Sequence, residues 1–365
     1  MTEIGIKAST KAYEAWLRDE LGKDMVVAAL RDKHTKMAEG PFPFLRATYW
    51  RWAETILKIC PELDDAPPVL AVGDIHIENF GTWRDIDGRL VWGVNDFDEA
   101  ARMPYALDLV RLATSALLGF GRIASSRAVC ASILRGYQRG LDDPRPIVLD
   151  HGYAWLRNLV VVPDEQRKRF WTKLKALEPG TKNPPARYVR CLAGAMPDRT
   201  LKMTIVPREA GAGSLGRPRW VGIAQWRGGP VVREAKAALP SAWTLAHGRG
   251  GRTLHITGIA TGRYRAPDPW FAIKDEIVVR RLSPNNRKLD AEAHLLDLMS
   301  TKMLRAMGRD LAAVHLGADD QRKRIKRDLA KRKPNWLDSA VKRAAKFVRR
   351  EHKEWRRKFL KQRQR

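Results

Sequence analysis

The residues of this chain that are best suited to chemistry lie in two short acidic segments. The first segment, GDIHIENFGT, carries Asp74 and, five positions later, Asn79. The second segment, NDFDEA, starts at Asn95 and carries Asp96. Transfer of a phosphoryl group needs a carboxylate that orients the attacking hydroxyl, together with oxygen ligands that hold magnesium on the phosphates. We therefore predict Asp74 as the catalytic carboxylate, and Asn79 with Asp96 as magnesium ligands.

A third segment, GAGSLG, is rich in glycine. It contains Gly211, Gly213, Ser214 and Gly216, and it lies between two strand-like runs. A dinucleotide-binding fingerprint needs a helix after its glycines, so this context disfavours one. It favours a loop in a hairpin whose backbone amides cover phosphates. An ordinary glycine-rich hairpin is the alternative.

The strand that follows this loop offers two cations for phosphate binding. It reads VVREAK and contains Arg233 and Lys236. Because side chains alternate along a strand, only one of the two can face the phosphates unless the strand has a bulge. An arginine would hold phosphate as a fork, and a lysine as a point charge.

Helices and strands are predicted around these segments from the spacing of apolar residues. In the first half we expect helices over 10–60, 104–120 and 126–141, and strands over 69–72 and 89–94, with a turn at Asp87-Gly88. In the second half we expect strands within 204–225, 230–237 and 278–282, a helix over 289–314, and a helical tail from 318 with a break at Pro334.

The two acidic segments resemble motifs of known families. Gly73-Asp74-Ile75-His76 through Asn79 resembles the catalytic loop of aminoglycoside phosphotransferases and choline kinases, and Val94-Asn95-Asp96-Phe97 resembles their metal motif. More closely, the chain resembles the bacterial domain-of-unknown-function family numbered 2252. The matching pieces, spread from residue 41 to 315, are PFPFLRATYW, GDIHIENFGTWRD, NDFDEA, GAGSLGRPRW, VVREAKA, VVRRLSP and GRDLAAVH. The family name alone does not decide a function.

The resemblance implies a role for each site residue. Asp74 would be the catalytic base, and His76 would support its loop. Asn79 and Asp96 would bind magnesium, and Asp98 would bind a second metal or the loop backbone. The glycine-rich loop and one cation of the following strand would bind the phosphates of ATP. No helix glutamate that would pair with that cation can be assigned.

The resemblance also implies an α+β, protein kinase-like fold of two lobes in a permuted order. The catalytic loop precedes the glycine-rich loop, whereas kinases have the reverse order. The piece GRDLAAVH, at 308–315, resembles the helix end that precedes the catalytic loop in aminoglycoside kinases. Circular permutation is tolerable because domain termini often lie close together. The expected parts are a catalytic lobe over 1–200, a β-rich nucleotide lobe over 201–288, a returning helix over 289–317 and a basic tail over 318–365.

Charge is the most unusual bulk property of the chain. The net charge is +27, and residues 321–365 hold 20 Lys and Arg against 4 Asp and Glu. Such a tail can bind nucleic acid or another anionic surface, or it can dock on the body of the protein. No transmembrane run and no signal-peptide core are seen, and the three cysteines lack metal-site spacing. These features predict a cytoplasmic location.

Several functions remain open from the sequence. The first is an ATP-dependent phosphotransferase acting on a hydroxyl of a small molecule, with nucleotidyl transfer as a close variant. The second is a nucleotide-binding pseudoenzyme, suggested by the arginine at the expected lysine position. The third is a nucleic-acid-binding protein that acts through residues 321–365.

Overall fold

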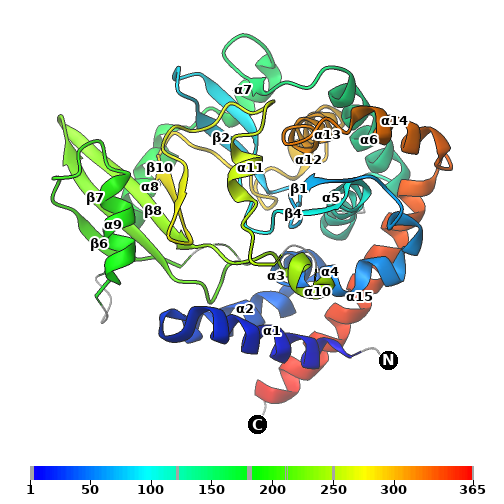
Figure 1. The fold of residues 1–365 in the computed structure, drawn as a ribbon, viewed down its shortest axis with the longest axis horizontal. Coiled ribbons are helices and arrows are strands. Elements are labelled where there is room, and N and C mark those ends of the chain that lie inside the picture. Colours follow the sequence, from blue (N-terminus) through cyan, green and yellow to red (C-terminus); the bar gives the residue numbers. More distant parts are fainter. Residues whose placement is uncertain are drawn as a thin grey trace.

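Three antiparallel sheets and many helices make up the part of the chain that the computed structural model describes (Figure 1). The described residues are 4–120, 123–178, 183–209, 211, 213–248 and 251–363. This mixture confirms the predicted α+β class. None of the described helices has the length and apolarity needed to cross a membrane.

The N-terminal region is helical, as predicted. Tyr13, Leu17 and Leu21 are buried at the spacing of a helix that packs one face on the core. Pro41 occupies the first turn of its helix, where its missing N–H costs nothing. The elements are α1 (Ile6–Leu21), η1 (Gly22–Asp24), α2 (Val27–Glu39), α3 (Pro41–Ala47), α4 (Tyr49–Ile59) and η2 (Pro61–Leu63).

Two small sheets bring the acidic segments together. The elements are β1 (Pro68–Ala71) with β4 (Ala101–Pro104), and β2 (Phe80–Arg84) with β3 (Leu90–Val94) and β5 (Ile147–Val148). Asp87 and Gly88 form the predicted turn between β2 and β3, with Gly88 at φ 76°. Phe80, at the start of β2, pairs with Val94, at the end of β3. The first acidic segment, just before β2, therefore lies beside the second, just after β3. The Asn95 amide donates to the Asn79 carbonyl at 3.3 Å.

Three helices pack behind these sheets: α5 (Tyr105–Phe120), α6 (Ser126–Asp142) and α13 (Thr301–His315). The crossing of α6 and α13 is close enough to require glycine. A Cβ on Gly136 would lie 2.0 Å from the Arg305 carbonyl oxygen, and one on Gly308 would lie 2.1 Å from the Ile133 carbonyl oxygen. These glycines explain how two helices far apart in sequence share one contact surface.

The helix predicted over 289–314 begins later than expected. Only α12 (Leu295–Leu298) and α13 are helical, and Ser300 caps α13 by accepting from the Met303 amide at 3.2 Å. The Ala291 amide instead donates to the Glu78 carboxylate at 2.8 Å. This contact holds the preceding segment against the first acidic loop, and tertiary structure overrides its helical pattern.

The five-stranded sheet follows the order β6-β7-β8-β10-β9 and lies beside the helical part (Figure 1). Its strands are β6 (Thr204–Pro207), β7 (Arg219–Trp226), β8 (Gly229–Ala237), β9 (Ala272–Lys274) and β10 (Ile277–Leu282). α8 (Asp164–Lys175) and α9 (Ala186–Gly194) pack on this sheet, and α11 (Ile256–Ala260) contacts β9. α7 (Ala154–Val160) follows β5 in the chain, and α10 (Ala242–His247) packs against α4. Tyr188 and Leu192 of α9 pack against Trp220 and Val279, which covers one face of the sheet.

The basic tail forms α14 (Arg322–Lys331) and α15 (Trp336–Arg363), with Pro334 between them as predicted. α15 runs along the outer edge of the molecule (Figure 1). Its inner face is buried, and Glu351 accepts from Arg51 Nε of α4 at 2.7 Å, with both side chains 4% exposed. The tail is therefore docked on the body through one face.

Candidate active site

Asp74 lies in a tight loop after β1 that is held from behind by Asp108 of α5. The Asp108 carboxylate accepts from the backbone amides of Val72, at 2.7 Å, and Gly73, at 3.0 Å. Gly73 has φ 80°, and a Cβ there would lie 2.3 Å from the Glu99 carbonyl oxygen. Only glycine fits this position without strain. The loop is thus fixed by local backbone and by a buried carboxylate, which the sequence did not single out.

The Asp74 carboxylate faces a small cavity. Its Oδ1 pairs with Arg111, and its side chain is 21% exposed. Burial raises the pKa of Asp74 to about 6, although the positive charge of Arg111 opposes this rise. One oxygen is therefore held by the protein, while the other faces the glycine-rich loop.

Asn79 is oriented as a candidate metal ligand. Its Nδ2 donates to the backbone carbonyls of Asp74, at 3.2 Å, and Asp96, at 3.1 Å. Its Oδ1 is buried and has no hydrogen-bond partner among the described residues. A buried acceptor without a partner is costly in free energy. The amide oxygen thus has the chemistry and orientation to bind a hard cation.

Asp96 provides the second oxygen group of this candidate site. Its side chain is 40% exposed, in the same cavity as Asn79. Burial alone would raise the pKa of Asp96, but the positive charges of Lys236 and Lys288 outweigh it and hold the pKa well below the usual range. The carboxylate is therefore ionised at neutral pH, as a metal ligand must be.

No complete metal site is made by protein side chains alone. Among the described residues, no group of three or more His, Cys, Asp or Glu side chains is placed to hold a metal ion. Magnesium commonly takes one or two protein ligands and completes its shell with water and phosphate oxygens. The Asn79 and Asp96 oxygens fit that pattern.

His76 lies in the wall of the cavity as a neutral side chain. Burial, reinforced by the positive charge of Arg46, lowers the pKa of His76 well below its usual value. The ring stands edge-on to Phe42, with centroids 6.2 Å apart. Its Nδ1 is buried and has no hydrogen-bond partner among the described residues, so the predicted role of His76 in supporting the loop stays a prediction.

Lys236, and not Arg233, reaches the acidic segments. Lys236 Nζ pairs with Asp98 and lies 3.7 Å from Asp96 Oδ1. Arg233 points to the other face of β8, where it donates to the Ala195 carbonyl at 2.7 Å and lies over the Trp270 ring at 4.4 Å. The structure therefore does not bring Arg233 into the candidate site. It also gives the lysine a carboxylate partner, Asp98.

The glycine-rich loop lies directly over Asp74. A Cβ on Gly213 would lie 3.2 Å from Asp74 Oδ2. The Gly213 carbonyl accepts from Lys33 Nζ of α2 at 3.3 Å. Gly216 instead faces the helices, because its Cβ would lie 2.9 Å from Leu30 Cδ2. Gly211, Gly213 and Ser214 border the cavity; Ala210 and Ala212 lie outside the described residues.

The cavity has a volume of about 60 Å³ and gathers most of the predicted site residues. Its walls include Asp74, His76, Asn79, Asp96, Asp98, Gly211, Gly213 and Ser214. These residues come from three separate segments of the sequence, within 74–79, 96–98 and 211–214. The folded chain therefore brings all three predicted segments to one cavity.

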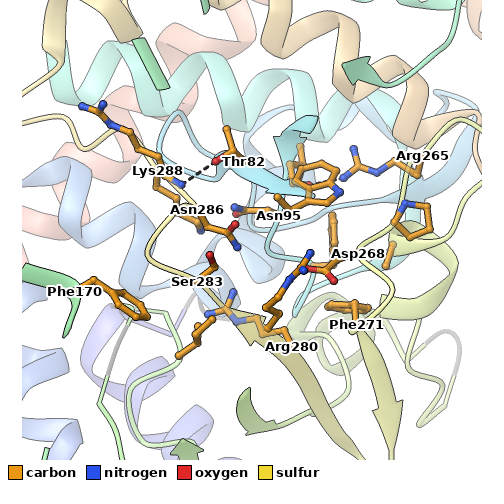
Figure 2. Close-up of a pocket in the computed structure, with 18 of the residues that line it drawn as sticks. Thr82, Asn95, Phe170, Arg265, Asp268, Phe271, Arg280, Ser283, Asn286 and Lys288 are labelled. Carbon is orange, nitrogen blue, oxygen red and sulfur yellow. Dashed lines mark hydrogen bonds and ion pairs between the residues drawn. The ribbon is translucent and has the colours of Figure 1, made fainter. Parts of the chain in front are cut away.

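A larger cavity of about 270 Å³ adjoins the second acidic segment (Figure 2). Asn95 lies near its centre in the view, with Phe170 and Phe271 on opposite sides. Arg280 also lines it, and Arg280 Nη2 pairs with Glu234 at 2.7 Å. The sequence did not predict this cavity, because its residues form no motif and come from separate segments.

Comparison with protein families finds a similarity in the part of the chain that carries both acidic segments. Residues 25–146 match a family described as an uncharacterized protein conserved in bacteria (DUF2252). No curated protein and no solved structure matches the chain. The predicted resemblance to this family is thus confirmed over residues 25–146, which include Asp74, Asn79 and Asp96.

Proposed function

We propose that this protein is an ATP-dependent phosphotransferase of kinase-like fold that acts on a hydroxyl group of a small molecule. The observation that carries the proposal is the meeting of five groups at one site. They are the Asp74 carboxylate, the Asn79 and Asp96 oxygens, the Gly213 backbone and the Lys236 amine. Phosphoryl transfer depends on positioning and on charge stabilisation, which such groups provide.

Each group has a definite part in the proposed reaction. Asp74, held through Oδ1 by Arg111, orients the acceptor hydroxyl and accepts its proton. The hydroxyl oxygen bonds to the γ-phosphorus of ATP, the bond to the bridging oxygen breaks, and ADP leaves. Magnesium, when bound, would neutralise phosphate charge. Lys236 lies close enough to Asp96 to share in binding the same phosphates.

The larger cavity is the candidate site for the nucleotide base. It adjoins Asn95, next to the metal-binding Asp96, and its aromatic walls include Phe97 and Phe271. Aromatic surface suits a planar base. The cavity beside Asp74 is too small for a triphosphate and an acceptor together, so the glycine-rich loop must move away from Asp74 when substrates bind.

The permuted order of the two lobes is part of the proposal. A sheet over 204–282 that packed away from Asp74 would have contradicted the permutation. The glycine-rich loop of this region instead lies against Asp74. The end of α13 lies behind the Asp74 loop, because His315 Nε2 lies 3.0 Å from the Asp108 carboxylate. These contacts support the interpretation that the segment GRDLAAVH lies beside the catalytic loop as the matching helix end does in kinases, although in this chain the segment comes after the loop.

The pseudoenzyme alternative depended on an arginine at the expected lysine position and on the helix glutamate that could not be assigned. Its first ground is weakened, because Lys236, and not Arg233, lies near Asp96. Its second ground remains, because Lys236 pairs with Asp98, which is not a helix glutamate.

Calorimetric titration with ATP, with and without magnesium, tests the proposal. We expect binding that requires magnesium and that is lost in Asp96→Ala. Asp87→Ala, in the exposed turn of the same hairpin, is the matched control and should bind normally. Asp74→Asn should bind MgATP but fail to turn over any acceptor found in a screen of hydroxyl compounds. Magnesium-independent binding, or equal binding by Asp96→Ala, would contradict the proposed metal site.

A further inference from the structure

The outward face of α15 carries basic side chains that no carboxylate neutralises. They are Lys346, Arg349, Arg350, Lys353, Arg356 and Arg357. All six are exposed, and none forms an ion pair with any other described residue. Arg349 donates to the Leu117 carbonyl at 3.5 Å, and Arg350 lies over the Phe347 ring at 4.9 Å. We call these six residues the α15 basic face.

Several other cations of the tail are paired with carboxylates, unlike those of the basic face. Lys342 pairs with Asp338 at 2.8 Å, and Arg332 pairs with Asp328 at 2.6 Å. The two acidic residues between Lys346 and Arg357 do not neutralise the basic face, because each pairs with another cation. Glu351 points inward to Arg51, and Glu354 pairs with Lys358.

The basic face is also not needed to dock the helix. Docking uses the opposite face, where Val341, Ala344 and Val348 are buried. Each residue of the basic face lies three or four positions from another one, and like charges at that spacing destabilise a helix. An anionic partner would relieve this repulsion.

We propose that the α15 basic face binds the phosphate backbone of a nucleic acid duplex without reading its sequence. The face extends over eleven residue steps, or about 17 Å of straight helix. A duplex presents one negative charge for about every 1.7 Å of its length, so several phosphates lie within reach. Four of the six residues are arginines, whose forked guanidinium suits phosphate oxygens.

An anionic membrane surface fits this face less well. Helices that lie on membranes bury an apolar face among the lipids. The apolar face of α15 is already buried in the protein, and no large apolar residue is exposed within the basic face. Leu360, 48% exposed, lies beyond its end.

The test uses the full chain, because deleting α15 would also uncover the core. Binding of a fluorescent 20-base-pair DNA or RNA duplex is measured by anisotropy at several salt concentrations. If all six cations contact phosphates, a plot of the logarithm of the association constant against the logarithm of the salt concentration should have a slope of about −5. The fourfold variant Lys346→Glu, Arg350→Glu, Lys353→Glu, Arg357→Glu should reduce this slope by about 3 to 4 and weaken binding about a hundredfold at low salt.

A matched control separates this face from total charge. The variant Lys168→Glu, Arg169→Glu, Lys173→Glu, Lys175→Glu makes the same charge change on the exposed side of α8. It should bind duplex almost as well as the wild type, and circular dichroism should show both variants folded. Equal losses in the two variants, or no binding by the wild type, would overturn the proposal. So would a face that binds phosphatidylserine vesicles but not duplexes, which would assign it to membranes.

Discussion

Removing the Asp108 carboxylate should destabilise the fold and displace the Asp74 loop. The Asp108 side chain is 1% exposed and accepts from the Val72 and Gly73 amides. His315 Nε2 also lies 3.0 Å from it, and His315 Nδ1 lies 2.8 Å from the Tyr137 hydroxyl. With Nε2 protonated, the imidazole donates to Asp108 and accepts from the tyrosine.

The expected loss follows from the donors left without a partner. Each buried N–H without an acceptor costs about 1–3 kcal/mol. In Asp108→Ala two backbone amides and the His315 Nε2–H lose their acceptor, so the free energy of unfolding should fall by about 3–9 kcal/mol. Asp108→Asn keeps one acceptor oxygen and should lose roughly half as much.

Urea unfolding followed by circular dichroism measures this change. Asp87→Ala, in the exposed turn between β2 and β3, serves as the control and should lose less than about 0.5 kcal/mol. A loss below about 1 kcal/mol in Asp108→Ala would refute the inference that this carboxylate holds the backbone before Asp74. In the proposed enzyme, Asp108→Asn should also lower turnover more than it weakens MgATP binding.

Two further predictions concern buried charges. Lys33 is 1% exposed, and burial, reinforced by the charge of Arg217, lowers its pKa to about 7. Between pH 7 and pH 9 the unfolded chain binds more protons at Lys33 than the folded chain, so the free energy of unfolding should rise with pH. Lys33→Met should reduce that slope by up to about 1.4 kcal/mol per pH unit. An unchanged slope in urea titrations at several pH values would contradict the lowered pKa. Glu351→Ala should lose about 1.5–3 kcal/mol, because the buried Arg51 loses one charge-assisted hydrogen bond while it keeps its contact with Glu54 at 3.2 Å. Glu354→Ala, on the same helix, should lose less than about 1 kcal/mol, and equal losses in thermal melts would show that the inner pair is not special.

The sequence predicted the local features well because nearby residues determine them. The turn at Asp87-Gly88, the strand before Asp74 and the break at Pro334 all lie where short-range rules place them. The two acidic segments could be recognised because their key residues lie within a few positions of each other. The similarity of residues 25–146 to the bacterial family could be predicted for the same reason.

Other features depended on contacts that no local pattern encodes. Residues 289–294 have helical spacing but stay non-helical, because the Glu78 carboxylate captures the Ala291 amide. The larger cavity is formed by segments that meet only in the folded chain. In the sequence, Asp108 is a single acidic residue within an apolar helix. Only the folded chain brings the Val72 and Gly73 amides to its carboxylate.

Alternation along β8 showed that Arg233 and Lys236 lie on opposite faces, but it could not show which face looks toward Asp96. That choice was made by packing: α9 covers the side where Arg233 donates to the Ala195 carbonyl, which leaves Lys236 facing the acidic segments. The sequence by itself thus determined the chemical groups and their local loops, since these depend on neighbouring residues. Tertiary structure decided which groups meet, because the burial of a face depends on what packs against it.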